Sequence, residues 1–285
     1  YLKIFVTSYL GVVIFKVLKA VAVSFSKIVD DLGKKFGVMG SQDLKNIFIG
    51  ARAGAIALGK DTEHLVGITD TLSSSWGVGV DAAANMSLAI LDSATAMGLA
   101  EDEGANLFGL LMNLDNLTQK QAENFAEGTY QMARMNQVAP TAVMRDIAGS
   151  SEFIAKYIGD GLDELRETAI QAKQLGINLS TVEKVADGLL DFQSSLKKEM
   201  TAQLILGKDI DLSYARQLAD QGKTKQMMDE ILKQLGNEQE FLEMGRLERQ
   251  AAADMLNMTN SELMMIYSNM GKNLEETKTF KDLLG

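Results

Sequence analysis

The stretch GAIALGKD at Gly54–Asp61 differs by one residue from the phosphate-binding pattern G-x-x-x-x-G-K-[ST]. In a working loop the backbone N–H groups and the lysine hold phosphates, and the final hydroxyl binds magnesium. Asp61 stands at the hydroxyl position and would add a negative charge beside a phosphate. The loop must also follow a buried strand, and Ile47–Ile49 is too short to form one. We therefore interpret Gly59 as the glycine that ends a helix, and we expect no nucleotide binding.

Residues suited to other chemistry are scarce. The chain has no cysteine, which excludes disulfides, thiolate metal sites and thiol nucleophiles. Its single histidine, His64, cannot by itself build a histidine metal site or a catalytic triad, and we interpret it as solvent-facing. Asp209 and Asp211 are spaced like part of a calcium loop, but the required glycine and final glutamate are missing. Asp211 is instead expected to cap the following helix. The sequence therefore predicts no catalytic residue, no metal, no cofactor and no enzymatic activity.

Composition predicts a folded chain that does not bind nucleic acid specifically. Hydrophobic residues make up 46% of the sequence and charged residues 23%, which is usual for a protein with a core. The formal net charge is −10, and no cluster of lysine and arginine offers a surface for phosphates. An acidic chain can still lie beside DNA if its role requires that it not adhere.

Several segments carry the start signals of helices. Three combine a hydroxyl residue with an acid or amide three residues later, the pattern of a capping box: Thr118–Gln121, Ser180–Glu183 and Thr259–Glu262. Pro140, the only proline, is placed to occupy the first turn of another helix. With no further proline, the helices can continue uninterrupted.

Helix ends repeat a second device, a glycine between two apolar residues. Such a glycine can adopt the left-handed conformation that closes a helix, and the next apolar residue folds back onto the last turn. The four examples are Phe36–Val38, Trp76–Val78, Met97–Leu99 and Leu175–Ile177. No long alternation of apolar and polar residues indicates a sheet. We predict an all-α fold of short to medium helices, divided into an apolar N-terminal helix over residues 1–37 and a helical region over residues 38–285.

The N-terminal segment Ile4–Phe25 is almost continuously apolar. A membrane span needs about 20 such residues, but Lys16 and Lys19 would each cost about 2.5–3.5 kcal/mol at the bilayer centre. Its polar residues fall on one helical stripe, which fits either a helix buried in a bundle or a membrane-entering oligomer with its lysines turned inward. The residues assigned to this candidate helix are Phe5, Val12, Val13, Phe15, Lys16 and Lys19.

Ser180–Gly207 is the longest helical segment that the pattern predicts. Apolar residues step through it by three and four, as along the seam of a coiled coil: Val182, Val185, Leu189, Phe192 and Leu196. At Met200 and Leu204 the register shifts by one residue. Two interpretations stay open, a self-association seam and the buried face of an ordinary long helix.

Two neighbouring blocks of the sequence resemble the tail tape measure proteins of tailed bacteriophages. The first is Val138–Gly188, which contains SSEFIAKY, and the second is Gly188–Gly222, which contains FQSSLKKEM and LGKDI. Leu72–Leu111 is similar in a less specific way, so that the resemblance spans about Leu72 to Leu256. It is strongest where the SSEFIAKY block is followed by the FQSSLKKEM block.

The resemblance implies a structural protein of the virion. A tape measure protein lies in the lumen of the tail tube, and its length sets the number of tube rings. It is typically a small homo-oligomer, often a trimer, which contacts the tail tube protein and the baseplate hub proteins and leaves with the DNA at infection. Some members have apolar segments thought to form a channel in the host inner membrane, a role that would suit Ile4–Phe25. The family implies no catalytic residue in these blocks.

One expectation departs from that family picture. As a single helix the chain would span about 430 Å at 1.5 Å per residue, whereas the glycine-closed helices predict compact packing. Since the chain begins at Tyr1, we expect a folded piece of a longer tape measure protein, near the baseplate end, with most of the measuring done by sequence outside it. The alternative is a membrane-active helical protein that forms a channel in the host membrane. A cell-wall hydrolase would need a placed catalytic acid, which the sequence does not offer.

Overall fold

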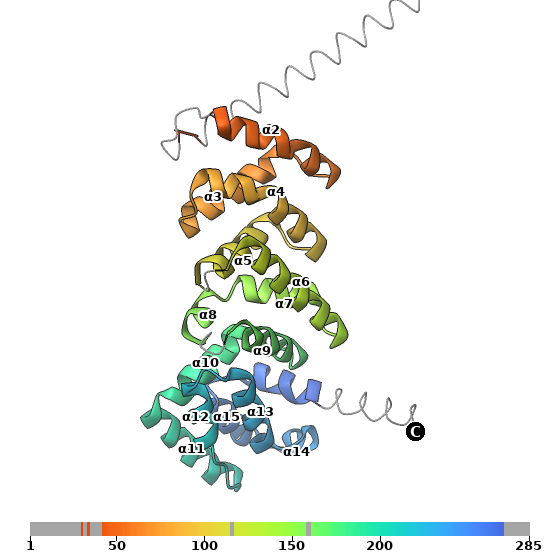
Figure 1. The fold of residues 1–285 in the computed structure, drawn as a ribbon. Coiled ribbons are helices and arrows are strands. Elements are labelled where there is room, and N and C mark those ends of the chain that lie inside the picture. The colour runs from red at the N-terminus through yellow and green to blue at the C-terminus, as the bar shows by residue number, and fades with distance from the viewer. Residues whose placement is uncertain (1–29, 31–32, 35–41, 115–116, 158–160, 271–285) are drawn as a thin grey trace, which may run out of the picture. The chain divides into compact units, whose positions relative to one another are not determined.

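The computed structural model describes residues 30, 33–34, 42–114, 117–157 and 161–270 (Figure 1). Within these ranges the regular structure is helical and contains no strand, which confirms the all-α prediction. The chain divides into two compact units, unit 1 up to Glu123 and unit 2 from Asn124 onward. The sequence did not predict this division, which falls inside α6 (Gln119–Met135). The predicted boundary after residue 37 lies outside the described residues.

Unit 1 is a group of helices packed against one another around an apolar centre (Figure 1). Its helices before α6 are α2 (Gln42–Ala57), α3 (Thr62–Trp76), α4 (Val80–Met97) and α5 (Glu101–Leu114). Completely buried side chains form the core: Phe48, Leu65, Ile68, Ile90, Leu107 and Phe108.

Glycines allow close approach of helices within unit 1. A Cβ atom at Gly54 would lie 2.7 Å from a methyl carbon of Leu88, so this glycine brings α2 close to α4. Gly50 meets nothing within 4 Å, so only one of the two glycines serves this purpose.

The glycine-closed helix ends are confirmed at three of the four predicted places. Gly77, Gly98 and Gly176 have φ values of 67°, 71° and 78°. At each, the N–H of the following apolar residue donates to a carbonyl at the helix end, as from Leu99 to Ala94 at 2.9 Å. The fourth predicted end, Phe36–Val38, lies outside the described residues.

The lookalike of a phosphate-binding loop is a helix end followed by a helix start. Gly59 has a φ of 72°, and the N–H of Lys60 donates to the carbonyl of Ala55 at 2.9 Å. Asp61 then caps α3, because its carboxylate accepts the N–H of Glu63 at 2.9 Å. The interpretation of Gly59 is therefore confirmed, and Asp61 has a structural use that the sequence analysis did not identify.

Two of the three predicted capping boxes are present. Thr118 pairs with Gln121 and Thr259 with Glu262, each through reciprocal backbone and side-chain hydrogen bonds. Pro140 begins α7 (Pro140–Ala148), as expected. The box predicted at Ser180 is wrong, because α10 (Leu179–Leu190) already begins after Asn178. Glu183 accepts a hydrogen bond from Lys156 at 2.9 Å instead.

Unit 2 is built from a longer succession of helices after α6 and α7. They are α8 (Ser151–Tyr157), α9 (Leu162–Gln174), α10, α11 (Phe192–Leu206), α12 (Ser213–Asp220), α13 (Thr224–Leu235), α14 (Glu238–Glu243) and α15 (Arg246–Met255), and residues 260–270 are also helical. Tyr267 lies in the core, stacks on Phe241 and donates its hydroxyl to the carbonyl of Leu235 at 2.8 Å.

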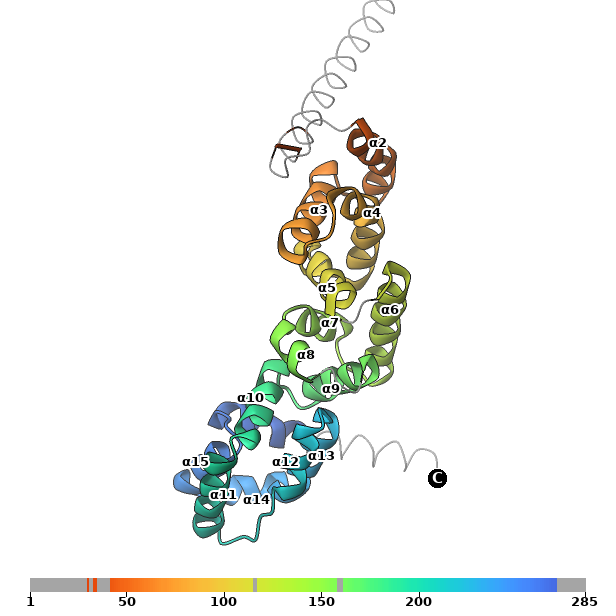
Figure 2. The ribbon, with the colours of Figure 1, turned by 60° about the vertical axis from the view of Figure 1, so that its left-hand side comes forward.

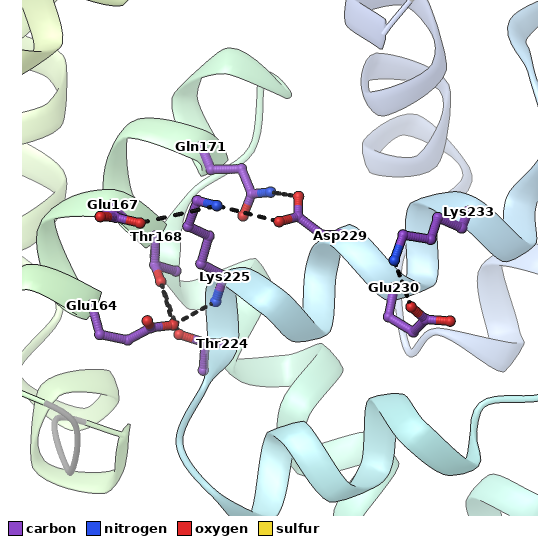
Figure 3. A network of polar contacts seen from close by, with 9 residues as sticks. All are labelled: Glu164, Glu167, Thr168, Gln171, Thr224, Lys225, Asp229, Glu230 and Lys233. Atoms are coloured by element: carbon purple, nitrogen blue, oxygen red, sulfur yellow. Dashed lines mark hydrogen bonds and ion pairs between the residues drawn. The ribbon is translucent and has the colours of Figure 1, made fainter.

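A polar network joins α9 to α13 within unit 2 (Figure 3). The hydroxyls of Thr168 and Thr224 lie 2.9 Å apart in the buried interior. Next to them the carboxylate of Glu164 accepts the backbone N–H of Lys225 at 2.8 Å, which satisfies a free donor at the start of α13. Gln171 donates to Asp229 one turn further along. The network sets the position of α13 along α9, since apolar contacts alone would permit sliding.

The N-terminal segment stays a prediction. Its assigned residues, Phe5, Val12, Val13, Phe15, Lys16 and Lys19, lie outside the described residues. None of the helices in the described ranges combines the length and apolar character that crossing a membrane requires.

Candidate functional site

The predicted long helix Ser180–Gly207 is two helices. Asp191 separates α10 from α11, because its backbone leaves the helical region with a ψ of 78°. Its carboxylate then accepts the N–H of Ser194 and caps α11. The apolar spacing continues across Asp191, so it could not reveal that one helix ends and another begins there.

Because the helix breaks at Asp191, the residues of the predicted seam lie partly in the core and partly on the surface. Val182, Val185 and Leu189 are buried in unit 2, whereas Phe192 and Leu196 are exposed on α11. The five residues therefore do not form one exposed seam. The interpretation as a buried face holds for α10, and self-association through the exposed pair stays a prediction.

An exposed apolar row runs along α11. It consists of four residues at intervals of four, Phe192, Leu196, Met200 and Leu204, with 57%, 48%, 63% and 85% of their surfaces exposed. Residues four apart lie on the same side of a helix, so the row is continuous. Its first two members belong to the predicted seam, and its other two stand where the sequence predicts a shift of register. We call these four residues the apolar row.

The side of α11 next to the apolar row is buried through polar and charged groups. Arg216 of α12 pairs with Glu199 and donates from Nε to the hydroxyl of Ser195 at 2.9 Å. All three residues are buried. Rotating α11 to bury the apolar row would expose this ion pair and break it, because Arg216 is held on a different helix. The pair therefore determines which side of α11 faces water.

A groove lies beside the apolar row, between α11 and α15, which pack side by side (Figure 2). Its volume is about 660 Å³. Its apolar lining residues are Ile205, Leu247, Ala251 and Met258. Its charged lining residues are three lysines, Lys184, Lys197 and Lys198, and two acids, Asp254 and Glu262. Its neutral polar lining residues are Ser194, Thr201, Gln250, Asn257 and Thr259. We call this surface the α11–α15 groove.

Asn257 closes one part of this groove in a strained backbone conformation. Its φ is 58°, which side chains other than glycine rarely adopt, although asparagine tolerates it better than most. Its side chain donates to the carbonyl of Lys184 at 3.3 Å and accepts from Lys198 at 2.7 Å. One residue therefore ties the end of α15 to α10 and α11.

We expect Asn257→Ala to lower the free energy of unfolding of unit 2 by about 2 kcal/mol. Alanine keeps the strain of the left-handed backbone and loses both hydrogen bonds. Asn257→Gly, which removes the strain as well as the bonds, should cost less. Urea unfolding followed by circular dichroism measures both variants. An alanine variant as stable as the natural chain would show that these ties contribute nothing.

The prediction that His64 faces solvent is incomplete, because both of its ring nitrogens lie close to carboxylates. Its Nδ1 lies 2.8 Å from the carboxylate of Asp61, and its Nε2 lies 3.2 Å from that of Glu101. The hydrogen bond with His64 lowers the pKa of the Asp61 carboxyl. Within the described ranges no group of histidine and acidic residues could hold a metal ion. The arrangement joins the starts of α3 and α5.

Asp211 satisfies a donor at the start of α12, as the sequence predicts, although Leu212 is the residue at the N-cap position. Its carboxylate accepts the N–H of Ser213 at 2.8 Å, next to the start of α12. Hydrogen bonds from Ser213 lower the pKa of this carboxyl.

Comparison of the chain with protein-family models, with curated proteins and with solved structures finds no match.

Proposed function

We propose that the chain is a folded segment of a tail tape measure protein, a structural protein of a tailed bacteriophage virion. It would lie in the lumen of the tail tube near the baseplate hub, initiate tail assembly or set tail length, and assist DNA ejection. The observation that carries the proposal is the apolar row on α11. It lies inside Gly188–Gly222, one of the two blocks that resemble tape measure proteins, and its side chains are exposed instead of packing in the core of unit 2.

Exposed apolar side chains in a continuous row favour contact with another protein surface. The proposed partners are further copies of the chain, forming a homo-oligomer that the family resemblance suggests is a trimer, together with the tail tube protein and the baseplate hub proteins. The net charge of −10 supports a place beside DNA without binding to it. A channel in the host membrane would depend on Ile4–Phe25, outside the described residues, and remains the alternative.

Substitution of the apolar row tests the assembly role. We expect Phe192→Asp/Leu196→Asp to lower the oligomeric state in solution, because each aspartate would have to lose water at the contact. Analytical ultracentrifugation measures the effect, and circular dichroism checks that the helices persist. The control is Ile49→Asp/Ile56→Asp on α2, two isoleucines with 59% and 58% of their surfaces exposed. An unchanged oligomeric state in the α11 variant would rule out the row as a self-association surface.

The function itself is tested by tail length in a phage that carries an in-frame deletion within Leu72–Leu256. Absent or unfinished tails, seen by electron microscopy, are expected for a segment that initiates assembly. Tails shortened in proportion to the deletion would make the segment part of the ruler. Normal, infectious tails would overturn the proposed function.

A further inference from the structure

The α11–α15 groove has an apolar floor, part of which the core of unit 2 leaves exposed. Ile205 in the last turn of α11 and Leu247 in the first turn of α15 both line it, and 77% of the surface of Leu247 is exposed. Ala251 and Met258 continue the apolar lining and are buried. Its volume of about 660 Å³ falls in the range of ligand-binding clefts. The apolar floor calls for an occupant with apolar side chains.

The lysines and the acids that line the groove differ in how many contacts they make with the rest of the chain. Lys184, Lys197 and Lys198 line it, and none of them forms an ion pair with any residue in the described ranges. Lys198 donates only to the neutral side chain of Asn257. The charge of Lys184 already acts on the nearby carboxylate of Glu262, whereas Lys197 and Lys198 have no acidic partner in the described ranges. In a chain with 38 acidic residues and 28 lysines and arginines, two such lysines at one groove favour an acidic occupant.

The two acids in the groove already accept hydrogen bonds from the chain itself. Glu262 accepts from the backbone and hydroxyl of Thr259 and from the hydroxyl of Thr181, at 2.7–2.8 Å. Asp254 accepts from Gln250 at 2.8 Å. These carboxylates are held in place, whereas the lysines lie on long flexible side chains that can move to meet a negative charge.

We propose that the α11–α15 groove binds an acidic amphipathic helix from a partner protein. Two helices packed side by side form a groove into which a third helix can lay apolar side chains spaced three or four residues apart. Its acidic side chains would then meet Lys184, Lys197 and Lys198. Nucleic acid and anionic lipid headgroups also attract lysines, but a phosphate group offers nothing to cover the apolar floor formed by Ile205 and Leu247. The proposal does not depend on the tape measure assignment, because it uses only unit 2.

A pair of synthetic peptides tests the proposal on the full chain. Each is a helix of about 15 residues with leucine at intervals of three and four. One carries glutamate at the remaining positions and the other carries lysine, and each bears a fluorescent label. We expect the glutamate peptide to bind at least tenfold more tightly, by fluorescence anisotropy, and to weaken as salt is added. Equal binding of the two peptides, or no binding, would overturn the proposal.

Variants then locate the binding. Lys184→Glu/Lys197→Glu leaves the contact between Lys198 and Asn257 intact and should weaken the glutamate peptide at least tenfold, as should Leu247→Asp. The control is Lys60→Glu/Lys223→Glu, which reverses two lysines outside the groove that also lack an ion pair in the described part of the chain. Thermal unfolding confirms that each variant is folded.

Other outcomes identify a different occupant. Unchanged peptide affinity in the groove variants would place the binding elsewhere and overturn the proposal. Binding of single-stranded DNA or phosphatidylglycerol vesicles through Lys184 and Lys197, without binding of the peptide, would also overturn it. The variant Phe192→Asp/Leu196→Asp should bind the peptide as tightly as the natural chain. A result against the groove proposal can therefore be distinguished from a result against self-association through the apolar row.

Discussion

Arg216→Met is expected to lower the free energy of unfolding of unit 2 by about 3–5 kcal/mol. The substitution removes the only described ion-pair partner of Glu199 and leaves its carboxylate buried on α11. It also removes the donor to the hydroxyl of Ser195. A single buried charge without a partner is among the most costly changes a core can undergo, because neither water nor a counter-ion replaces what was lost.

Urea unfolding followed by far-ultraviolet circular dichroism measures this loss, and the fluorescence of Trp76, the only tryptophan, reports on unit 1 separately. The double variant Glu199→Met/Arg216→Met should recover most of the stability, since an apolar pair of similar volume often replaces a buried ion pair. The control Lys233→Met breaks the exposed pair with Glu230 and should cost less than about 1 kcal/mol. If Arg216→Met cost no more than this control, the buried pair would not hold α11 in place.

Gly109→Ala is expected to destabilise unit 1 by about 3 kcal/mol, at the upper end for an overpacked site. A Cβ atom at Gly109 would lie 2.3–2.6 Å from three ring atoms of Trp76, and the planar indole can give way only by moving as a whole. The ring would then lose its hydrogen bond from Nε1 to Asn106, at 3.2 Å. Greater exposure of the indole to water should shift the fluorescence emission of Trp76 to longer wavelength.

The same substitution at Gly50 is the matched control. Gly50 also lies within a helix of unit 1, but nothing stands within 4 Å of the position of its Cβ atom. Gly50→Ala should therefore stabilise the chain by about 0.5–1 kcal/mol, because alanine has the higher helix propensity. If the two variants changed the free energy of unfolding equally, helix propensity alone would explain both changes, and the contact with Trp76 would contribute nothing.

Features that depend on a few neighbouring residues could be predicted from the sequence. The glycines at Gly59, Gly77 and Gly98 end helices because the left-handed conformation and its hydrogen bonds form within one turn. The capping boxes at Thr118 and Thr259 are equally local. The local prediction at Ser180 was wrong because α10 begins earlier, after Asn178, where the N–H of Leu179 donates to the carboxylate of Asp146 on α7 at 2.9 Å.

Only the tertiary structure could place residues that meet across the chain. His64 is held between Asp61, three residues before it, and Glu101, which belongs to a different helix. Asp187 likewise accepts the hydroxyl of Tyr157 at 2.5 Å from another helix, while burial, the larger effect, and this hydrogen bond together raise the pKa of that tyrosine. No spacing along the sequence reports such contacts.

Helix α11 is the clearest case in which the sequence did not indicate which side of a helix is buried. Its apolar spacing is visible in the sequence, and apolar residues are usually buried. Yet Phe192, Leu196, Met200 and Leu204 face water, while Glu199 is buried against Arg216. The sequence alone determined that this segment is helical and that one side of it is apolar. The tertiary structure decided which side faces the core, because a buried charge can be satisfied only where its partner on α12 lies, whereas apolar side chains can be covered by any partner surface.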